Sequence, residues 1–480
     1  MITLASHRSG LSGVVFHRLP SGRWPMPGGC LTIWILLLLL GGPLPAQQPP
    51  GAGDGWFAWR GPLGTGEAPR ARPPVGWSEN ENVRWKTELP GEGHSTPLVV
   101  GDRVLVTAAE PVGLPGEPRY SGAPGAHDNR PITHRHRFLV LALDRYDGSI
   151  LWERAVHEAL PHEGAHFTGS LASGSPVTDG QRVYAVFGSY GVYCLDLDGN
   201  LLWKKTLGTM NTKHGHGEGS SPVLVDGKLI VNWDHEGDSF VVALDSASGE
   251  ELWRSPRDEP TSWASPLVVE QAGRYQVVIA GTARIRSYDP ENGDVIWECG
   301  GLSDNVVATP VAGDGMLFAG SSYETRKLLA IRLADARGDI TDSDHVVWST
   351  RDRTPYVPSP LLYRGALYYL RHYQGILSRR EAATGEELAG PYRLEGLRDI
   401  YASPVAADGR IYVTDRAGVT VVMTHVDDPR NQPPRMLAAN RIDDRVNASL
   451  ALAGRQLFIR GEQALYCIEE TGTEQGHSRD

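Results

Sequence analysis

Short hydrophobic runs alternate with polar turns along most of this chain, and a Ser/Thr-Pro dipeptide opens each group of runs. The dipeptide stands at Thr96-Pro97, Ser175-Pro176, Ser221-Pro222, Ser265-Pro266, Thr309-Pro310, Ser359-Pro360 and Ser403-Pro404, with a degenerate eighth copy at Ser449-Leu450. Successive copies are separated by 79, 46, 44, 44, 50, 44 and 46 residues. A repeat of this length filled by short strands is typical of a β-propeller, in which each sheet buries its faces against its neighbours.

The third copy shows the pattern inside one repeat. A hydrophobic run over 221–225 is followed by the turn Asp226-Gly227 and by a return run. A third run covers 240–245, and a fourth begins at Glu251. Asp-Gly between two hydrophobic runs is typical of a hairpin. The repeat therefore predicts a blade of four antiparallel strands, and the eight copies predict an all-β, eight-bladed propeller.

The two ends of the chain are predicted to close the ring together. The eighth repeat supplies three runs, near 448–452, 456–460 and 464–468, and then continues into a polar tail without a fourth. The segment 82–86 resembles a fourth strand and precedes the first repeat. We expect this N-terminal strand to complete blade 8, which would remove the open edge of the sheet.

Residues 1–46 have the pattern of an export signal. The run Leu31–Leu40 is almost wholly apolar, and Pro43-Leu44-Pro45-Ala46 supplies a small-residue end. The run is shorter than a membrane-spanning helix requires and fits the apolar region of a signal peptide. We therefore expect export to the periplasm or the extracellular space, and no transmembrane span after cleavage. An uncleaved N-terminal anchor is the alternative, and Met26 is an alternative start.

The rest of the chain divides into an N-terminal extension (47–81), the propeller (82–468) and a polar tail (469–480). The first interval between repeats exceeds the others by about 34 residues. The excess lies in an insertion in blade 1 at 108–137, which is rich in Gly, Pro and His and shows no strand pattern. Long loops of this kind are either functional or flexible decoration.

Charge and cysteine content narrow the classes of partner. The formal net charge is −11, and removing residues 1–46, which hold three arginines and no acid, makes it −11 − 3 = −14. An acidic chain gives no support to nucleic-acid binding. Cys194, Cys299 and Cys467 remain after such cleavage. An odd number excludes a fully paired set, and we expect small buried side chains.

A second repeated phrase, Ala-x-Asp-x-x-(Thr/Ser/Asp)-Gly-x-x-x-Trp, leads into the fourth run. It stands at 142–152, recurs at 243–253 and 287–297, and is shortened at 194–203. The Asp can accept backbone hydrogen bonds in an Asx-turn, the Gly can take a positive φ, and the Trp offers a flat surface to the next blade. We expect these residues to hold the blades together and assign them no catalytic role.

The phrase resembles the tryptophan-docking motif of the PQQ-like (pyrroloquinoline quinone) propeller repeats, and the resemblance covers about residues 82–468. That family includes quinoprotein alcohol and glucose dehydrogenases and non-enzymatic assembly factors of the BamB type. Resemblance to the alcohol dehydrogenases implies adjacent cysteines beside the quinone, but no two cysteines are neighbours here, and no Cys-x-x-Cys-His haem motif is present. The chain therefore resembles the BamB-type propellers more, although the lipobox of most of these is absent.

One face of the predicted ring gathers candidate metal ligands. Links into the first strand and links between the second and third strands emerge on one face of a propeller, around the channel. On that face, blades 1–3 concentrate histidines and carboxylates, donors that suit zinc or another divalent metal. The candidate ligands are His162, His166, His214, His216, Glu218, Asp234 and His235. A polar rim in which the histidines hydrogen-bond to neighbouring loops is the alternative.

Blades 4–8 place arginines beside acids on the same face. The candidates for holding an anionic ligand, such as a carboxylate or a quinone acid, are Arg284, Arg351, Arg353, Arg371 and Arg398. Mutual pairing with the neighbouring acids is the alternative, and it contributes little where the pairs are exposed.

Together these features predict an exported ligand-binding or assembly scaffold that works through the polar channel face, with an envelope protein or a small anionic ligand as its partner. One alternative is a quinoprotein-like oxidoreductase, a PQQ-dependent dehydrogenase with PQQ and a divalent metal. The other is a metal-dependent enzyme that uses the His/carboxylate cluster of blades 1–3.

Overall fold

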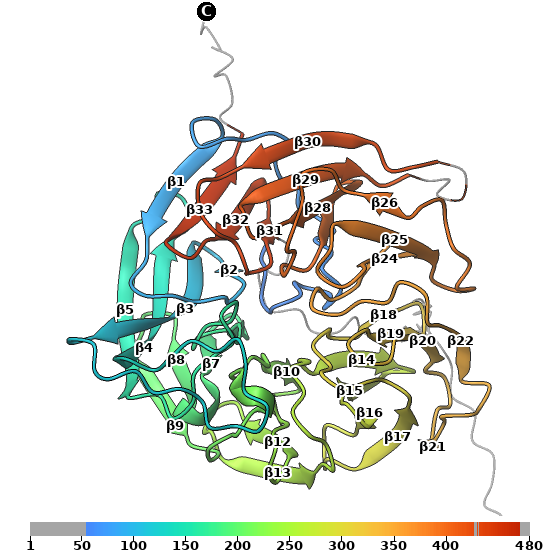
Figure 1. The fold of residues 1–480 in the computed structure, drawn as a ribbon, viewed down its shortest axis with the longest axis horizontal. Helices are drawn as coiled ribbons and strands as arrows, with labels where there is room; N and C mark the ends of the chain where they lie inside the picture. The colour runs from blue at the N-terminus through green and yellow to red at the C-terminus, as the bar shows by residue number, and fades with distance from the viewer. Residues whose placement is uncertain (1–53, 427–429, 431, 471–480) are drawn as a thin grey trace, which may run out of the picture. The chain divides into compact units, whose positions relative to one another are not determined.

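The fold is described from a computed structural model, in which residues 54–426, 430 and 432–470 are described. The predicted export signal, residues 47–53 and residues 471–480 of the tail lie outside the described residues. The described chain forms eight β-sheets arranged around a ring (Figure 1). The sequence prediction of an all-β, eight-bladed propeller with four-stranded antiparallel blades is therefore confirmed.

Each blade begins with a short strand at the channel and continues outward (Figure 1). Blade 1 contains β2 (Leu98–Val100), β3 (Arg103–Val112), β4 (Arg135–Asp144) and β5 (Ile150–Ala159). Blade 2 contains β6 (Val177–Thr178), β7 (Arg182–Val186), β8 (Val192–Asp196) and β9 (Leu201–Lys205). Blade 3 contains β10 (Val223–Val225), β11 (Lys228–Trp233), β12 (Phe240–Asp245) and β13 (Glu251–Pro256). Blade 4 contains β14 (Leu267–Gln271), β15 (Arg274–Ala280), β16 (Arg284–Tyr288) and β17 (Val295–Gly300).

The second half of the ring follows the same order. Blade 5 contains β18 (Val311–Gly313), β19 (Met316–Ser321), β20 (Lys327–Arg332) and β22 (Val346–Thr350). Blade 6 contains β23 (Leu361–Tyr363), β24 (Ala366–Leu370), β25 (Ile376–Glu381) and β26 (Tyr392–Arg393). Blade 7 contains β27 (Val405–Ala407), β28 (Arg410–Thr414), β29 (Val419–Thr424) and β30 (Met436–Arg441). Blade 8 contains β31 (Ala451–Ala453), β32 (Gln456–Arg460), β33 (Ala464–Glu469) and β1 (Val83–Glu88).

Three short elements supplement the blades. The strand β21 (Gly338–Asp339) pairs in parallel with β17 and adds a fifth strand to blade 4, which the sequence pattern did not predict. The 3₁₀ helices η1 (Gly188–Tyr190) and η2 (Lys213–Gly215) lie in links of blades 2 and 3. No helix of the described chain is long and apolar enough to cross a membrane.

The N-terminal strand closes the ring as predicted. β1 pairs antiparallel with β33, the last strand of the eighth repeat, and places Trp85 opposite Cys467 and Lys86 opposite Tyr466. Residues from the two ends of the described chain thus form one sheet, in which β33 is paired on both sides.

The Ser/Thr-Pro dipeptides join successive blades rather than starting strands. The hydrophobic run at 221–225 suggested a strand from Ser221, but β10 begins at Val223, because proline cannot donate to a sheet. Instead, the backbone N–H at each repeated Ser/Thr donates to the hydroxyl at the same position of the next blade, over 2.8–3.0 Å. The donors are Thr96, Ser175, Ser221, Ser265, Thr309, Ser359 and Ser403.

This circle of hydrogen bonds has one gap. The eighth bond would run from the N–H of Ser449 to the hydroxyl of Thr96. Within residues 54–470 as far as the structure describes them, the buried Thr96 Oγ1 has no hydrogen-bond partner. The gap lies between blades 8 and 1, where the closing strand joins the ring.

The Trp and Gly of the repeated Ala-x-Asp-x-x-(Thr/Ser/Asp)-Gly-x-x-x-Trp motif form contacts between adjacent blades. Trp203 Nε1 donates to Ser246 O in the next blade at 3.0 Å, and a Cβ added to Gly249 would lie 2.6 Å from the Trp203 ring. The same Trp–Gly contact recurs in the pairs Trp85–Gly148, Trp152–Gly199, Trp253–Gly293 and Trp348–Gly385. Glycine is therefore required at this position for two reasons: the backbone has a positive φ, and the indole ring leaves no room for a Cβ.

The described part of the N-terminal extension crosses the channel. Trp56 exchanges two backbone hydrogen bonds of 2.9 Å with Val99 in β2. The buried Arg60 donates to the carbonyl oxygens of Pro360 and Pro404, each at 3.0 Å. Burial lowers the pKa of Arg60 to about 9. The segment thus connects blade 1 with blades 6 and 7 across the axis of the ring.

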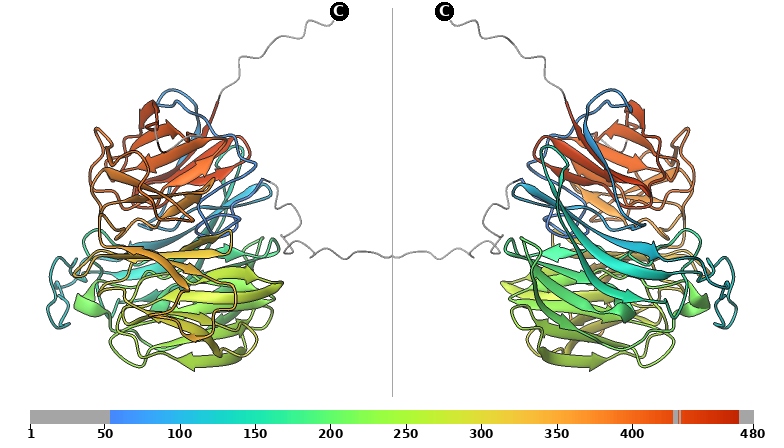
Figure 2. Two further views of the ribbon diagram at one scale, coloured as in Figure 1. Left: turned by 90° about the vertical axis from the view of Figure 1, so that its right-hand side faces the viewer. Right: turned by 90° about the vertical axis from the view of Figure 1, so that its left-hand side faces the viewer.

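The insertion of blade 1 is partly strand. β3 extends to Val112 and β4 starts at Arg135, so the expectation of no strand in 108–137 is wrong at both ends. The two strands pair over their full length, because their register continues to Val112 opposite Arg135. The remaining link, 113–134, projects from one face of the ring in side view (Figure 2).

Candidate functional site at the channel mouth

The links into the first strands and the links between second and third strands contact one another at one end of the channel, which we call the channel mouth. The N–H of His166 donates to His216 O at 3.0 Å, which joins the links of blades 2 and 3. Trp263 Nε1 donates to Gly217 O at 2.7 Å and joins blade 4 to blade 3. These contacts bring several of the predicted site residues together.

Four imidazole rings form a cluster on this mouth. The centroid of His127, in the link 113–134, lies 4.9 Å from that of His214 and 4.8 Å from that of His216. His214 and His216 are 5.4 Å apart, and His166 lies 4.8 Å from His216. Burial, with a smaller contribution from His166, lowers the pKa of His216 to about 4. The His216 ring is therefore neutral at pH 7.

Glu218 lies in a small cavity between blades 2 and 3. Its carboxylate accepts hydrogen bonds from the N–H of Ser189, at 2.7 Å, and from the Ser189 hydroxyl. Burial raises the pKa of Glu218 to about 7, and the nearby Glu163 adds to this effect. His162 Nε2 lies 3.9 Å from Glu218 Oε1 but hydrogen-bonds to Met210 O at 2.8 Å. The cavity leaves about 40 Å³ for the centres of water molecules.

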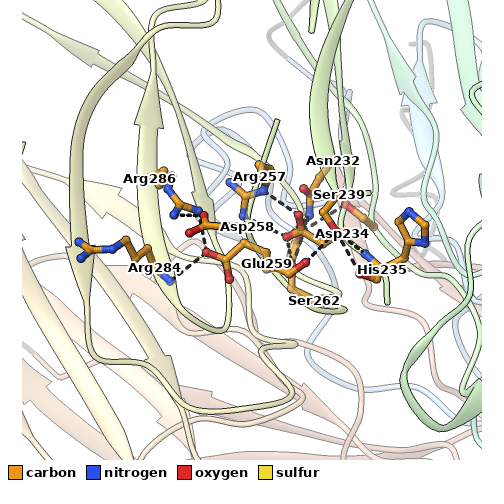
Figure 3. Close-up of polar contacts among 12 residues, drawn as sticks. Asn232, Asp234, His235, Ser239, Arg257, Asp258, Glu259, Ser262, Arg284 and Arg286 are labelled. Carbon is orange, nitrogen blue, oxygen red and sulfur yellow. Dashed lines mark hydrogen bonds and ion pairs between the residues drawn. The ribbon is translucent and has the colours of Figure 1, made fainter. Parts of the chain in front are cut away.

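Asp234 belongs to a buried ion pair (Figure 3). Its carboxylate accepts hydrogen bonds from Arg257 Nε at 2.6 Å, from Arg257 Nη2 at 3.0 Å and from Ser262 Oγ at 2.6 Å. The Asp234 and Arg257 side chains are fully buried. The His235 ring points away from this pair, and its Nε2 lies 3.3 Å from Asp238 O. Asp234 is thus fully engaged by donors of its own protein.

The seven predicted metal ligands therefore separate into three groups. His166, His214 and His216 share the imidazole cluster, His162 accompanies Glu218, and the third group is Asp234 with His235. As the side chains of the described residues stand, no three or more His, Cys, Asp or Glu are arranged so that they could hold a metal ion.

The predicted anion-binding arginines differ in their pairing. Arg284 pairs with Asp339 at 2.9 Å and with Glu298 at 3.2 Å, and Arg353 pairs with Asp352 at 2.7 Å. These two arginines follow the alternative of mutual pairing. The other three side chains stay accessible at the mouth: Arg351 and Arg398 are exposed, and Arg371 is half-buried.

Sequence reasoning missed an arc of rings on the other side of the mouth. Tyr356 stacks on Tyr323 at 5.8 Å and on His372 at 4.4 Å, measured between ring centroids. Tyr373 lies 4.2 Å from His372 and stacks on Tyr401 at 5.9 Å with an interplanar angle of 5°. We call these five residues the aromatic arc. It spans the links of blades 5, 6 and 7.

A signal for the arc was present in the repeat. Tyr356 and Tyr401 stand three and two residues before the repeated serines at 359 and 403, and Trp263 stands two before Ser265. Alignment of the repeats on the Ser/Thr-Pro dipeptide places Trp263 and Tyr401 at the same position of the link and Tyr356 one residue earlier. Residues at this place are carried to the mouth, because the dipeptide itself lies at the inner end of each blade.

The fold and the mouth define a PQQ-like β-propeller. A family model described as "Outer membrane protein assembly factor BamB" matches residues 136–390 and 237–475, well over half of the chain, and the chain belongs to this family. The comparison with curated proteins found no match.

Three solved structures show the same fold. BamB from Moraxella catarrhalis is 16% identical, with 76% of this chain and 100% of that chain covered and a TM-score of 0.50. A europium-containing methanol dehydrogenase is 11% identical, with coverage of 86% and 90% and a TM-score of 0.57. The quinohemoprotein alcohol dehydrogenase from Comamonas testosteroni is 10% identical, with coverage of 89% and 83% and a TM-score of 0.56. Identities this low establish the fold alone.

The residues of this chain lack the cysteine pair that the resemblance to the alcohol dehydrogenases implies beside a quinone. Cys194, Cys299 and Cys467 are buried in three different blades, so no cysteine pair can flank a cofactor. Burial raises the pKa of Cys299 to about 11 and that of Cys194 to about 12, which leaves both as thiols at neutral pH. We therefore derive no redox step for this protein.

Proposed function

We propose that this protein is an exported propeller scaffold that binds a protein partner of the cell envelope through the aromatic arc at its channel mouth. The arc is the observation that carries this proposal. Tyrosine and other aromatic residues dominate the energetic centres of protein interfaces, because they bury a large area at a small entropic cost. The export pattern of residues 1–46 and the family's description as an envelope assembly factor support the location.

The arc has the exposure that a binding surface needs. The side chain of Tyr323 is 41% exposed at one end, and Phe167, across Arg416 at the other end, is 48% exposed. The Arg416 guanidinium lies 5.4 Å from the centroid of Tyr401 and 5.9 Å from that of Phe167. A partner that packs on this surface would complete the stacking at both ends.

The charge beside the arc predicts the chemistry of the partner. Burial lowers the pKa of His372, and the cationic Arg326 and Arg371 lower it further, so these guanidinium groups lie close to the stack. A partner segment with acidic residues next to apolar ones matches this surface. Steering by opposite charge would mainly raise the association rate and make it depend on salt.

Site-specific photo-crosslinking tests the proposal. A photoreactive phenylalanine analogue is placed at Tyr323 and, as a matched control, at Tyr146, which is 52% exposed in the β4–β5 turn at the opposite face. In cells of the source organism, position 323 is expected to give a discrete adduct in the envelope fraction, and Tyr401→Ala should weaken it. Equal adducts from both positions, or none from position 323, would contradict the proposal.

Export is tested separately by sequencing the N-terminus of the purified mature chain. A mature N-terminus close to Gln47 supports export and cleavage. An intact N-terminal segment on the membrane fraction would support an uncleaved anchor, and an intact segment in the cytosol would refute export.

A further inference from the structure

Arg416 lies at the channel mouth between residues of blade 7 and blade 2. It stands in the link between β28 and β29, where its N–H donates to Asp399 O at 3.3 Å and its carbonyl oxygen accepts from the N–H of Val446 at 3.2 Å. Its guanidinium lies 5.4 Å from the ring centroid of Tyr401, in the link into blade 7, and 5.9 Å from that of Phe167, in the link into blade 2. The charged group is thus held between two aromatic rings, an arrangement that a cation favours.

One edge of the guanidinium is fixed by Asn447, in the link into blade 8. Arg416 Nε donates to Asn447 Oδ1 at 2.9 Å. A guanidinium only donates, so the amide oxygen faces Arg416 and the amide nitrogen faces away from it. That nitrogen lies 3.2 Å from His94 Nε2 and 3.3 Å from Glu462 Oε1, and both of these atoms can accept. The network therefore sets the direction of the Arg416 side chain before any ligand binds.

The two outer nitrogens of Arg416 remain available. As far as the structure describes the chain, Nη1 and Nη2 make no hydrogen bond, and no carboxylate oxygen lies within 4.0 Å of the guanidinium. The side chain is half-buried, and neither nitrogen is shut off from solvent. Two parallel N–H groups of a guanidinium match the two oxygens of a carboxylate, and this pairing is stronger than a neutral hydrogen bond.

The acids near this site have donors of their own. Glu92 pairs with Arg130. Asp415 and Asp444 each accept hydrogen bonds from three backbone N–H groups. Glu462 contacts the amide nitrogen of the neighbouring asparagine instead of the guanidinium. The protein thus leaves the outer nitrogens of this arginine without an acid in contact.

The field beside Arg416 favours an anion. Burial lowers the pKa of His94 to about 3, and the charges of Arg130, Arg460 and Arg416 lower it further. The charged groups that act on this ring are therefore all positive. His94 is neutral at pH 7 and accepts from the same amide that holds Arg416. A negative group that reaches the outer nitrogens enters a positive potential.

We propose that Arg416 binds a carboxylate of the partner, on an Asp or Glu side chain whose apolar neighbours in the sequence pack on Tyr401 and Phe167. The identity of the ligand as part of a protein rests on the proposed function, whereas the carboxylate chemistry follows from Arg416 itself. Arg416 is not among the five arginines predicted from the sequence. Unlike Arg284 and Arg353, it combines a fixed direction with unpaired outer nitrogens.

Ligand-observed NMR titration with two peptides tests the site. The probes are acetyl-Gly-Phe-Asp-Phe-Gly-amide and the same peptide with Asn in place of Asp, which differ in one charge. We expect the wild type to bind the Asp peptide about tenfold more tightly. Arg416→Gln should abolish this preference, and Arg416→Lys should keep only part of it, because lysine retains the charge but not the paired N–H groups. The matched control is Arg284→Gln, which removes a guanidinium already paired with Asp339 and should leave the preference unchanged.

The comparison of the two peptides on the wild type does not depend on how any variant folds. Failure of the wild type to bind the Asp peptide, equal affinity for both peptides, or the full preference in Arg416→Gln would each overturn the proposal. Inorganic phosphate serves as a competitor, and tighter binding of phosphate than of the Asp peptide would overturn the assignment to a carboxylate. Photo-crosslinking at Tyr323 separates this result from the proposed function. An adduct without a peptide preference refutes the role of Arg416 alone, whereas a preference without an adduct supports the carboxylate site and contradicts the envelope partner.

Discussion

Replacing the hydroxyl of Thr309 by a methyl group tests the circle of hydrogen bonds between blades. Thr309 Oγ1 accepts the bond from the N–H of Ser265 at 2.8 Å, and both residues are buried. Thr309→Val keeps the shape and the branching at Cβ, so it opens no cavity. Thr96→Val is the matched control at the same repeat position, because Thr96 Oγ1 has no partner among the described residues.

The two substitutions should differ clearly in free energy of unfolding. In Thr309→Val, the buried N–H of Ser265 is left without an acceptor. The expected loss is therefore about 1–3 kcal/mol. In Thr96→Val, an unsatisfied hydroxyl is replaced by an apolar group, so the change should be neutral or stabilising by about 1 kcal/mol.

Equilibrium unfolding in guanidinium chloride measures the difference. Both variants and the wild type are compared at equal slope, so that a shift in midpoint reports stability alone. A change in slope would mean that the unfolded or native ensemble had altered. Equal losses in the two variants, or a loss below about 0.5 kcal/mol in Thr309→Val, would refute the circle as a source of stability.

Three other predictions use the same unfolding assay. Gly249→Ala should destabilise the protein by several kcal/mol more than Gly227→Ala. The two glycines have similar φ (+74° and +72°), but a Cβ at 249 would lie 2.6 Å from a tryptophan ring. Equal effects of the two substitutions would argue against the docking contact. Asp234→Ala should cost about 3–5 kcal/mol, because Arg257 would remain buried without its partner, and a loss under about 1 kcal/mol would contradict this. Burial, helped by nearby guanidinium groups, lowers the pKa of His94 to about 3 from 6.5. The contribution of neutral His94 to the free energy of unfolding is therefore complete above pH 6.5. It falls by about 1.4 kcal/mol per pH unit as the pH drops from 6.5 toward 3. The variant His94→Gln should flatten this acid dependence between pH 6 and 4, and an unchanged slope would exclude His94 as its source.

The architecture was predictable because the repeat determines it locally. The period, the hairpin turns and the missing fourth strand of the last repeat are visible in sequence order, and together they predicted the eight blades and the pairing of β1 with β33. The hydroxyl circle was not predicted, although its serines and threonines recur in every repeat of the sequence. Their role depends on the distance between equivalent positions of adjacent blades, which no single repeat contains.

The site was harder to predict because its side chains contact residues of other loops, and these contacts depend on how the loops fold. Topology carries the links of blades 2 and 3 to one end, so the meeting of His166 with His216 follows from the fold. Asp234 is equally close in the sequence to these histidines, yet Arg257 from the next link takes both of its oxygens. The direction of each side chain decides between these outcomes, and the residue types alone did not encode it.

The gap in the hydroxyl circle lies at the joint where the N-terminal strand completes blade 8. Six inter-blade joints within 96–403 and the joint to Ser449 each carry a buried hydroxyl bond, whereas the joint between blades 8 and 1 does not. At that joint the closing segment supplies two other contacts: β1 pairs with β33, and Trp85 Nε1 donates to Arg145 O in blade 1 at 2.9 Å. The single strand β1 therefore pairs with the last strand of blade 8 and also contacts blade 1. The joint that lacks the repeated bond is thus stabilised by the N-terminal strand and also by Arg145 of blade 1, which donates to Gln456 Oε1 at 2.6 Å and to Ala453 O at 3.0 Å in blade 8.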